Sequence, residues 1–330
     1  MKPLDPQPYI DGVLAGDRRM LSKSITLIES ALATHQETAR RILSALLPKT
    51  GVAVRLGITG VPGVGKSTFI ESFGTMLVRK GHRVAVLAVD PSSGRSGGSI
   101  MADKTRMERL STEPRAFIRP SPSGGTLGGV ARKTRETMLV CEAAGYDVII
   151  VETVGVGQSE TTVASMVDFF LVLLLAGAGD ELQGIKKGIL ELADSLAINK
   201  ADGDNLGPAK KAAKVFESAL HLLQPSSPRW TPPVLTCSAL ELTGIDTIWK
   251  TVLKHREVFS QSRELEQKRR QQAVAWMWSL IDEGLKERFA RQPDIKKQLP
   301  RILREVERGA LDPTAAADKL LFLLDNKPYQ

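Results

Sequence analysis

A stretch near residue 60 has the residue types and the spacing that bind nucleotide phosphates. It reads G-x-x-x-x-G-K-S from Gly60 to Ser67, the P-loop motif, after a β-branched apolar segment and before apolar residues at helical spacing. Its glycines let successive backbone N–H groups point inward at an anion, and the positive end of the following helix adds to that field. Lys66 is expected to reach the β- and γ-phosphates, and the hydroxyl of Ser67 is expected to hold Mg²⁺. The residues expected to surround the phosphates are Gly60, Val61, Pro62, Gly63, Val64, Gly65, Lys66, Ser67 and Thr68.

Two further apolar segments end in carboxylates that suit magnesium. One ends at Asp90 and is followed by a Gly/Ser-rich stretch that leads to Asp103; we expect this stretch to order around Mg²⁺ like a switch, with a surface loop as the alternative. The other ends at Glu152, three residues before Gly155, in an E-x-x-G variant of the more usual D-x-x-G. The Gly155 N–H is expected to sense the γ-phosphate. The residues expected to hold the metal, directly or through water, are Ser67, Asp90, Asp103 and Glu152.

The tetrapeptide Asn199-Lys200-Ala201-Asp202 indicates which base is bound. A carboxylate at Asp202 accepts from both N1–H and the 2-amino group of guanine, whereas adenine offers neither donor and would leave the carboxylate unpaired. Asn199 is expected to bond the purine and tie loops together, and the Lys200 stem is expected to lie over the ring. Backbone N–H groups near O6 of guanine are expected from Ser238, Ala239 and Leu240. The bound nucleotide is therefore predicted to be GTP or GDP.

The sequence offers fewer candidates for residues that catalyse hydrolysis than for residues that bind the nucleotide. Metal, lysine and backbone amides are expected to stabilise charge on the transferred phosphoryl group, but no residue is an obvious water-positioning group or arginine finger. A lysine in the segment 177–188, Lys186, is expected to complete the site, or a partner does so. The predicted catalytic residues are Lys66, Asp90, Glu152 and Lys186, and slow intrinsic conversion of GTP and water to GDP and phosphate is expected.

These side chains need a scaffold that brings them to one place. Strand and helix patterns alternate from about residue 50 to residue 254, which predicts an α/β fold: a P-loop NTPase with a mostly parallel sheet covered by helices on both faces. Ligands of such sheets lie beyond the carboxyl ends of the strands. The expected strands are Val52–Thr59, Arg83–Asp90, Ala116–Arg119, Val148–Glu152, Phe169–Leu175, Ser195–Asn199 and Val234–Ser238.

Helical patterns flank this domain on both sides. The expected division is an N-terminal helical extension at 1–48, a GTPase domain at 49–254, and a C-terminal helical dimerisation arm at 255–330. The arm carries an apolar stripe at helical spacing, which suits either packing on the main domain or a homodimer contact. We define this arm stripe as Val274, Met277, Trp278, Ile281 and Leu285.

Composition limits the partners that the chain is expected to have. The formal net charge is +8 over 330 residues, but basic and acidic residues are interleaved, so no nucleic-acid partner is expected. The longest apolar run, 169–176, is far shorter than the roughly 20 residues that span a bilayer, so no membrane partner is expected. The opening residues do not resemble a secretory signal, and two widely spaced cysteines fit a cytoplasmic protein.

The ordered set of motifs resembles the MeaB/ArgK family of SIMIBI-class P-loop GTPases. The motifs are Gly-Val-Pro-Gly-Val-Gly-Lys-Ser, Val-Asp-Pro-Ser-Ser, Asp-Lys-Thr-Arg-Met, Val-Glu-Thr-Val-Gly-Val-Gly-Gln-Ser-Glu and Asn-Lys-Ala-Asp. The resemblance covers essentially the whole chain. It implies a GTPase that chaperones adenosylcobalamin-dependent methylmalonyl-CoA mutase, protecting the mutase and gating its cofactor loading. It also implies a homodimer through the C-terminal arm and slow hydrolysis that the mutase stimulates.

Two other functions remain open from the residues. One is an ATP-dependent small-molecule kinase linked to arginine/ornithine transport, which nothing in these residues supports. The other is a nucleotide-gated binding protein whose hydrolysis is incidental. Related metallochaperone GTPases carry Cys/His metal motifs, and the absence of such motifs from this sequence argues against nickel or zinc delivery.

Overall fold

The computed structural model describes residues 4–89, 107–120, 127–153, 159–177, 187–222 and 227–325, and within these ranges seven parallel strands form one sheet. The order across the sheet is β3-β2-β4-β1-β5-β6-β7. The strands are β1 (Val54–Gly60), β2 (Val84–Val89), β3 (Ala116–Arg119), β4 (Val148–Thr153), β5 (Phe169–Leu175), β6 (Ser195–Asn199) and β7 (Val234–Thr236).

The strand order places β1 at the centre, between β4 and β5. Because every strand pair is parallel, the carboxyl ends of β1, β4, β5 and β6 meet at one edge of the sheet. The connection from β1 to β2 runs into one half of the sheet and the connection from β4 to β5 into the other, and such a switch point is where open parallel sheets bind ligands. The predicted α/β fold is confirmed, and the ends of the predicted strands differ from the observed ones by no more than two residues.

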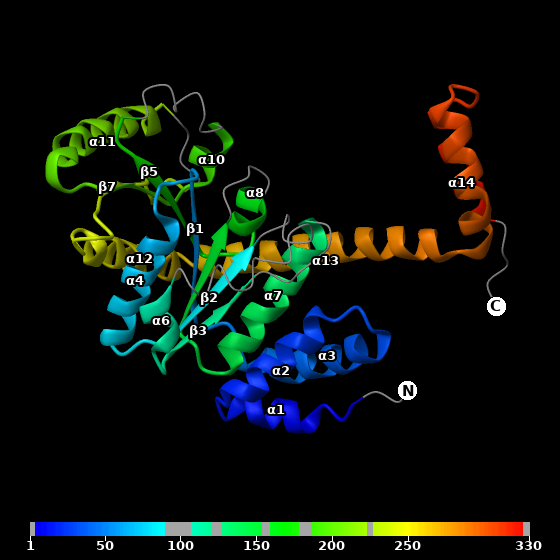
Figure 1. Cartoon of the computed structure of the whole chain (residues 1–330), viewed down its shortest axis with the longest axis horizontal. Helices are drawn as coiled ribbons and strands as arrows, with labels where there is room; N and C mark the ends of the chain where they lie inside the picture. The colour runs from blue at the N-terminus through cyan, green and yellow to red at the C-terminus, as the bar shows by residue number, and fades with distance from the viewer. Residues whose placement is uncertain are drawn as a thin grey trace. The chain divides into compact units, whose positions relative to one another are not determined.

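Helices cover both faces of the sheet (Figure 1). Side chains along each strand alternate between two buried clusters; Leu56 and Ile58 enter one cluster, whereas Ile149 and Val151 enter the other. The helices of the first cluster are α4 (Lys66–Arg79), α6 (Glu108–Thr112) and α12 (Ile245–Gln261). Those of the second are α7 (Leu127–Ala143), α8 (Ser159–Ala164), α10 (Lys187–Leu192) and α11 (Leu206–Leu220).

The N-terminal residues add a further layer of helices over α7 (Figure 1). These are α1 (Gln7–Leu14), α2 (Arg18–Glu29) and α3 (Ala33–Leu46), followed by a 3₁₀ turn at Leu47–Lys49. Asp17 begins α2 by accepting the N–H groups of Arg19 and Met20 at 2.7 and 3.1 Å, as an N-cap residue does. An ion pair between Arg119 and Glu29 joins this layer to the edge strand β3.

Buried charges tie the first turns of α13 (Glu264–Arg291) to the amino-terminal edge of the sheet. Arg269 donates to both carboxylate oxygens of Asp168, at 2.8 and 2.7 Å, and to the Ala53 carbonyl at 2.7 Å. Asp168 is 4% exposed and also accepts the Arg55 N–H at 3.0 Å. Burial opposes ionisation of Asp168, but the hydrogen bonds and charges of Arg269 and Arg55 outweigh it and hold the pKa of that carboxyl below its usual value.

Two more residues of α13 reach the same corner of the sheet. Gln272 donates to the Val167 carbonyl at 2.8 Å, and Lys268 donates to the Asp168 carbonyl at 2.8 Å. We call Lys268, Arg269 and Gln272 the α13 anchor. These contacts make the start of α13 part of the sheet domain.

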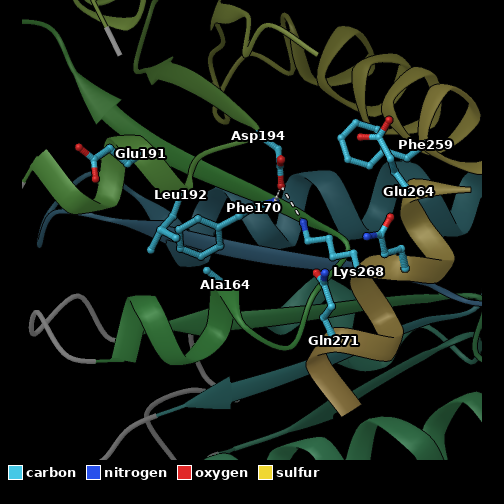
Figure 2. Close-up of a pocket in the computed structure, with 10 residues that line it drawn as sticks. Ala164, Phe170, Glu191, Leu192, Asp194, Phe259, Glu264, Lys268 and Gln271 are labelled. Atoms are coloured by element: carbon cyan, nitrogen blue, oxygen red, sulfur yellow. Dashed lines mark hydrogen bonds and ion pairs between the residues drawn. The ribbon is translucent and has the colours of Figure 1, made fainter. Parts of the chain in front are cut away.

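A cavity of about 410 Å³ lies beside the α13 anchor (Figure 2). Figure 2 shows Lys268 pointing toward Asp194, whose carboxylate lies 3.5 Å from the Lys268 ammonium, with Phe170 and Leu192 on the apolar side. Phe170 lies at the start of β5, and Asp194 immediately precedes β6. The cavity is therefore at the amino-terminal edge of the sheet, opposite the edge where β1 leads into α4.

Contacts divide the chain into Met1–Gln272 and Ala273–Gln330. The second unit holds the rest of α13, α14 (Pro293–Glu307) and α15 (Pro313–Asp325), and it buries Ile295 and Ile302. The predicted start of the C-terminal arm, residue 255, lies inside α12, and that division of the chain stays a prediction.

Replacing Arg269 by Ala is expected to lower the free energy of unfolding by about 3–5 kcal/mol, because it leaves Asp168 buried without its charged partner. The folded-state pKa of Asp168 is depressed, so its contribution is present above the unfolded pKa near ~4 and is lost as the pH falls through the folded value. The difference between native and variant, measured by urea unfolding, should therefore narrow below about pH 4.

The matched control is Arg270→Ala, one residue further along the helix. Arg270 pairs with Glu266 on the exposed side of α13, so its loss should cost under about 0.5 kcal/mol. Equal destabilisation by the two substitutions would contradict the role assigned to Arg269.

Candidate functional site

The P-loop joins β1 to α4 at the centre of the sheet's carboxyl edge. Gly65 takes a φ of 90° directly before α4 begins at Lys66, a conformation that any side chain would strain. A Cβ added at Gly60 would lie 2.5 Å from the carbonyl oxygen of Leu173 on β5. The backbone therefore requires glycine at Gly60 and Gly65. The first N–H groups of α4 have no partner within the helix, as at the start of any α-helix, and such groups can bind an anion.

Lys66 is folded back over the loop that precedes it. Its Nζ donates to the Gly60 carbonyl at 2.7 Å and lies 3.4 Å from that of Val61. Burial lowers the pKa of this ammonium group, whereas the carboxylates of Glu152 and Glu160 act in the opposite direction. Phosphate oxygens are stronger partners for an ammonium than carbonyls are, so a bound nucleotide would draw Lys66 from the loop.

Ser67 and Glu152 bring two of the predicted magnesium ligands together. The Ser67 Oγ, on the first turn of α4, lies 3.5 Å from Glu152 Oε1 at the carboxyl end of β4. Next to them, the buried hydroxyls of Thr59 and Thr153 share a hydrogen bond of 2.6 Å that joins β1 to β4. Hydroxyl and carboxylate oxygens are donors that Mg²⁺ prefers, so these two residues fit the ion. The ion, when bound, would neutralise charge on the β- and γ-phosphates.

Asn199 connects the phosphate side of the site to the base side. Its side chain, on a residue that is 1% exposed, donates from Nδ2 to the Val64 carbonyl at 2.8 Å. Its Oδ1 accepts the Ala239 N–H at 3.2 Å and the Cys237 thiol at 3.6 Å. Burial raises the pKa of that thiol to about 12, so Cys237 stays a neutral donor. One amide therefore joins the P-loop, β6 and the segment after β7.

Asp202 faces the segment that follows β7. The Ser238 hydroxyl donates to Asp202 Oδ2 and accepts the Glu241 N–H at 3.0 Å, which orients the carboxylate without covering it. The Ala239 N–H, a predicted donor to guanine O6, here donates to Asn199, and Leu240 is 80% exposed. The carboxylate and the backbone donors predicted for guanine therefore belong to adjoining segments of one edge.

Lys200 has a φ of 58°, in the left-handed region that residues with side chains seldom adopt. Its Cε lies 3.8 Å from the position that a Cβ would take at Gly65. The lysine stem therefore runs beside the P-loop, between the phosphate side and the base side of the site.

Four predicted site residues lie outside the described ranges: Asp90, Asp103, Gly155 and Lys186. The structure brings Lys66, Ser67 and Glu152 together on the phosphate side. It brings Asn199, Asp202 and Ser238 together on the base side.

Sequence reasoning missed two buried polar residues at the site. Ser72, on the inner face of α4, donates to the Ala239 carbonyl at 2.7 Å and joins the P-loop helix to the segment after β7. Glu160, at the start of α8, is 3% exposed, and its charge acts on Lys66. A serine among the apolar positions of α4 was the only available signal for Ser72.

Within the ranges that the structure describes, no cluster of three or more histidine, cysteine or acidic side chains is arranged to hold a metal ion. Among the helices of the same ranges, none combines the length and the apolar character that crossing a bilayer requires.

A family model described as "Methylmalonyl Co-A mutase-associated GTPase MeaB" matches residues 21–294. A "Putative GTPase" of Caulobacter vibrioides is 58% identical over 94% of this chain and 94% of its own length.

Two more distant relatives carry more specific names. The "Methylmalonic aciduria type A homolog, mitochondrial" of Mus musculus is 48% identical over 96% of this chain and 79% of its own length. A solved structure named "Crystal structure of LAO/AO transport system kinase" has a TM-score of 0.77 and 42% identity, and the match covers 97% of this chain and 98% of that one.

Replacing Asp202 by Asn is expected to weaken GTP binding about 10- to 100-fold, because a charged acceptor facing two guanine donors is lost. The amide can donate to the 2-oxo group of xanthine, so the variant should bind xanthosine triphosphate more tightly than the native chain does. Competition against a fluorescent guanine nucleotide measures both constants, with Asp204→Ala, on the same turn, as the control. Native binding of ATP as tight as that of GTP would contradict the assignment of the base.

Proposed function

Because this chain belongs to the MeaB family of P-loop GTPases and is itself a GTPase, we propose that it is a GTP-driven chaperone of adenosylcobalamin-dependent methylmalonyl-CoA mutase. In this role it protects the mutase from inactivation and gates the loading of its cofactor. The protein acts as a cytoplasmic homodimer, and GTP hydrolysis is slow until the mutase accelerates it.

The observation that carries this proposal is the match of the MeaB model, whose description names association with the mutase, to most of the chain. The mouse relative, named for methylmalonic aciduria, points to the same metabolic step. The site supports a GTPase in particular, because Asn199, Asp202 and Ser238 belong to adjoining segments, as the proposed guanine contacts would require.

The chain's own residues divide the work of hydrolysis. The P-loop backbone and Lys66 hold the phosphates, and Ser67 with Glu152 would hold Mg²⁺. Asp90, Asp103, Gly155 and Lys186 are proposed to complete the metal and γ-phosphate contacts. None of the described residues is an evident water-positioning group, which supports slow turnover that a partner accelerates.

The arm stripe supports the homodimer. Its five side chains are each between 39% and 57% exposed on one face of α13. A hollow of about 400 Å³ lies on the same helix, and its lining includes Met277, Ile281 and Leu285 of the stripe. Apolar faces with tryptophan and methionine are typical of permanent contacts, and we propose that a second copy of the chain covers this one.

The solved relative, named as a transport system kinase, keeps an ATP-dependent small-molecule kinase as the rival function. The two functions differ in the base that they require. Asp202 would face adenine without a donor, which disfavours ATP and therefore the kinase.

Mixing the chain with the mutase and GTP is expected to slow the loss of mutase activity during turnover. The mutase is expected to raise the GTPase rate at least about tenfold, because a partner that completes the site lowers the barrier by about 1.4 kcal/mol or more. The sharpest control is Asp202→Asn, which should protect the mutase with xanthosine triphosphate. The chaperone function would be contradicted if the chain left the lifetime of mutase activity unchanged and the mutase left the GTPase rate unchanged. A non-hydrolysable GTP analogue that supports cofactor loading as well as GTP does would indicate that hydrolysis is incidental.

Changing Trp278 and Leu285 together to Asp is expected to turn the dimer into a monomer, because the arm stripe can no longer bury two large apolar side chains. Sedimentation velocity measures the mass, and GTP affinity should stay at the native value because the site lies in residues 1–272. Glu287→Ala, an exposed change on the same helix, is the matched control. A native chain that sediments as a monomer, or a doubly substituted chain that stays dimeric, would refute the contact.

A further inference from the structure

Asn205 occupies a helix-capping position but does not cap the helix. It is the N-cap residue of α11, where an asparagine side chain ordinarily accepts an N–H of the first turn. No such hydrogen bond is made here. Its Nδ2 instead donates to the carbonyl of Lys200, five residues earlier, at 2.6 Å. The side chain therefore serves the N-K-x-D segment and not the helix that it begins.

Asn205 holds this segment at two points. Besides the bond from its side chain to Lys200, its backbone N–H donates to the Asp202 carbonyl at 2.9 Å and closes the 3₁₀ turn Gly203–Asn205. These two acceptors belong to the lysine expected over the purine face and to the aspartate expected at the purine edge. One asparagine thus fixes the backbone of both base-recognising residues.

Lys200 needs such a hold because of its backbone conformation. Its φ of 58° is unfavourable for a residue with a Cβ, and conformations of this kind persist only where the surroundings impose them. The same conformation directs the lysine stem along Gly65 of the P-loop. If the carbonyl of Lys200 were released, the residue would relax toward a common conformation and the stem would leave the P-loop.

The other end of the contact is rigid. Helix α11 packs on β6 and β7 and buries Ala209, Ala213 and Phe216. Because Asn205 begins this packed helix, its position is fixed relative to the sheet, and its hydrogen bonds can restrain the backbone of residues 200–202.

We propose that Asn205 is a positioning residue for guanine recognition, which holds Lys200 in the left-handed conformation and thereby places both Lys200 and Asp202 against the base. The inference rests on the GTP site of the proposed function but not on the mutase partner. In this role Asn205 acts through the backbone of Lys200 and Asp202, to whose carbonyls it donates, and not by direct contact with the base.

Asn205→Ala is expected to raise the Kd for GTP about three- to tenfold, the effect of one lost hydrogen bond at an ordered site. KM should rise in parallel while kcat changes less than about twofold, because the contact orders the bound base equally in the ground and transition states. Asp204→Ala, the exposed neighbour on the same turn, should leave both constants at native values. Thermal unfolding of each variant shows whether the fold is kept.

A double-mutant cycle separates positioning from general support of the structure. Glycine adopts a positive φ without strain, so in a Lys200→Gly background the hold of Asn205 is no longer needed. Adding Asn205→Ala to Lys200→Gly should then change the Kd for GTP by less than about 1.5-fold, well below the effect in the native background. Equal effects in the two backgrounds would refute action through Lys200.

The remaining outcomes are equally decisive. A lower unfolding temperature for Asn205→Ala with an unchanged Kd for GTP would make Asn205 a stabiliser of α11 only, and would overturn the proposal. A native chain that binds ATP as tightly as GTP would overturn the guanine site itself, which is a different failure. Loss of mutase protection with nucleotide binding intact would leave the role of Asn205 standing.

Discussion

The nucleotide site depends on one buried amide. Asn199 is the last residue of β6, and its side-chain Nδ2 donates to the Val64 carbonyl in the P-loop. Its Oδ1 accepts the N–H of Ala239, which follows β7. The segment 61–65 and the residue Asn199 are more than 130 residues apart in sequence, and the amide of Asn199 joins them to the segment after β7. The ribose limits the distance between a nucleotide's phosphates and its base, so the protein must keep the segments that bind them within that range.

Around that amide, neighbouring residues repeat the same tie. Ser72 links the P-loop helix to the Ala239 carbonyl, and Ser238 links Asp202 to the segment after β7. The Ser72 bond is buried and uncharged, whereas the Ser238 bond is partly buried and ends on a carboxylate. A buried polar group without its partner is costly. These bonds hold the segments around Asn199 and Asp202 together without a nucleotide, and this would leave binding energy for contacts made only when GTP is present.

The sheet and the main site motifs could be predicted from sequence because their signals are local. Buried parallel strands have continuous apolar sequences. The P-loop and N-K-x-D are short contiguous motifs, and their chemistry requires those residue types. The contacts that sequence reasoning missed join distant positions. Arg269 and Asp168 are 101 residues apart, and nothing in the local sequence around either residue predicts that the two are in contact.

Asn205 shows a second limit of sequence reasoning. An asparagine before a helix is expected to cap it, and the composition of the turn offers nothing against that expectation. The structure shows that the side-chain amide of Asn205 donates instead to the carbonyl of Lys200, whose backbone is in the left-handed conformation. Local propensity identifies the residue that belongs at a position, but the competition between two possible partners is decided by the fold.

The α13 anchor also sets how short this chain can be made. A fragment that stopped at residue 254 would keep every described nucleotide-binding residue, yet it would lose the guanidinium that neutralises Asp168 and the amide that caps the Val167 carbonyl. The exposed corner would leave Asp168 with only Arg55 to offset its charge, next to newly uncovered apolar surface. The smallest piece that can stand alone as a nucleotide binder must therefore run through Gln272, well past the last strand of its sheet.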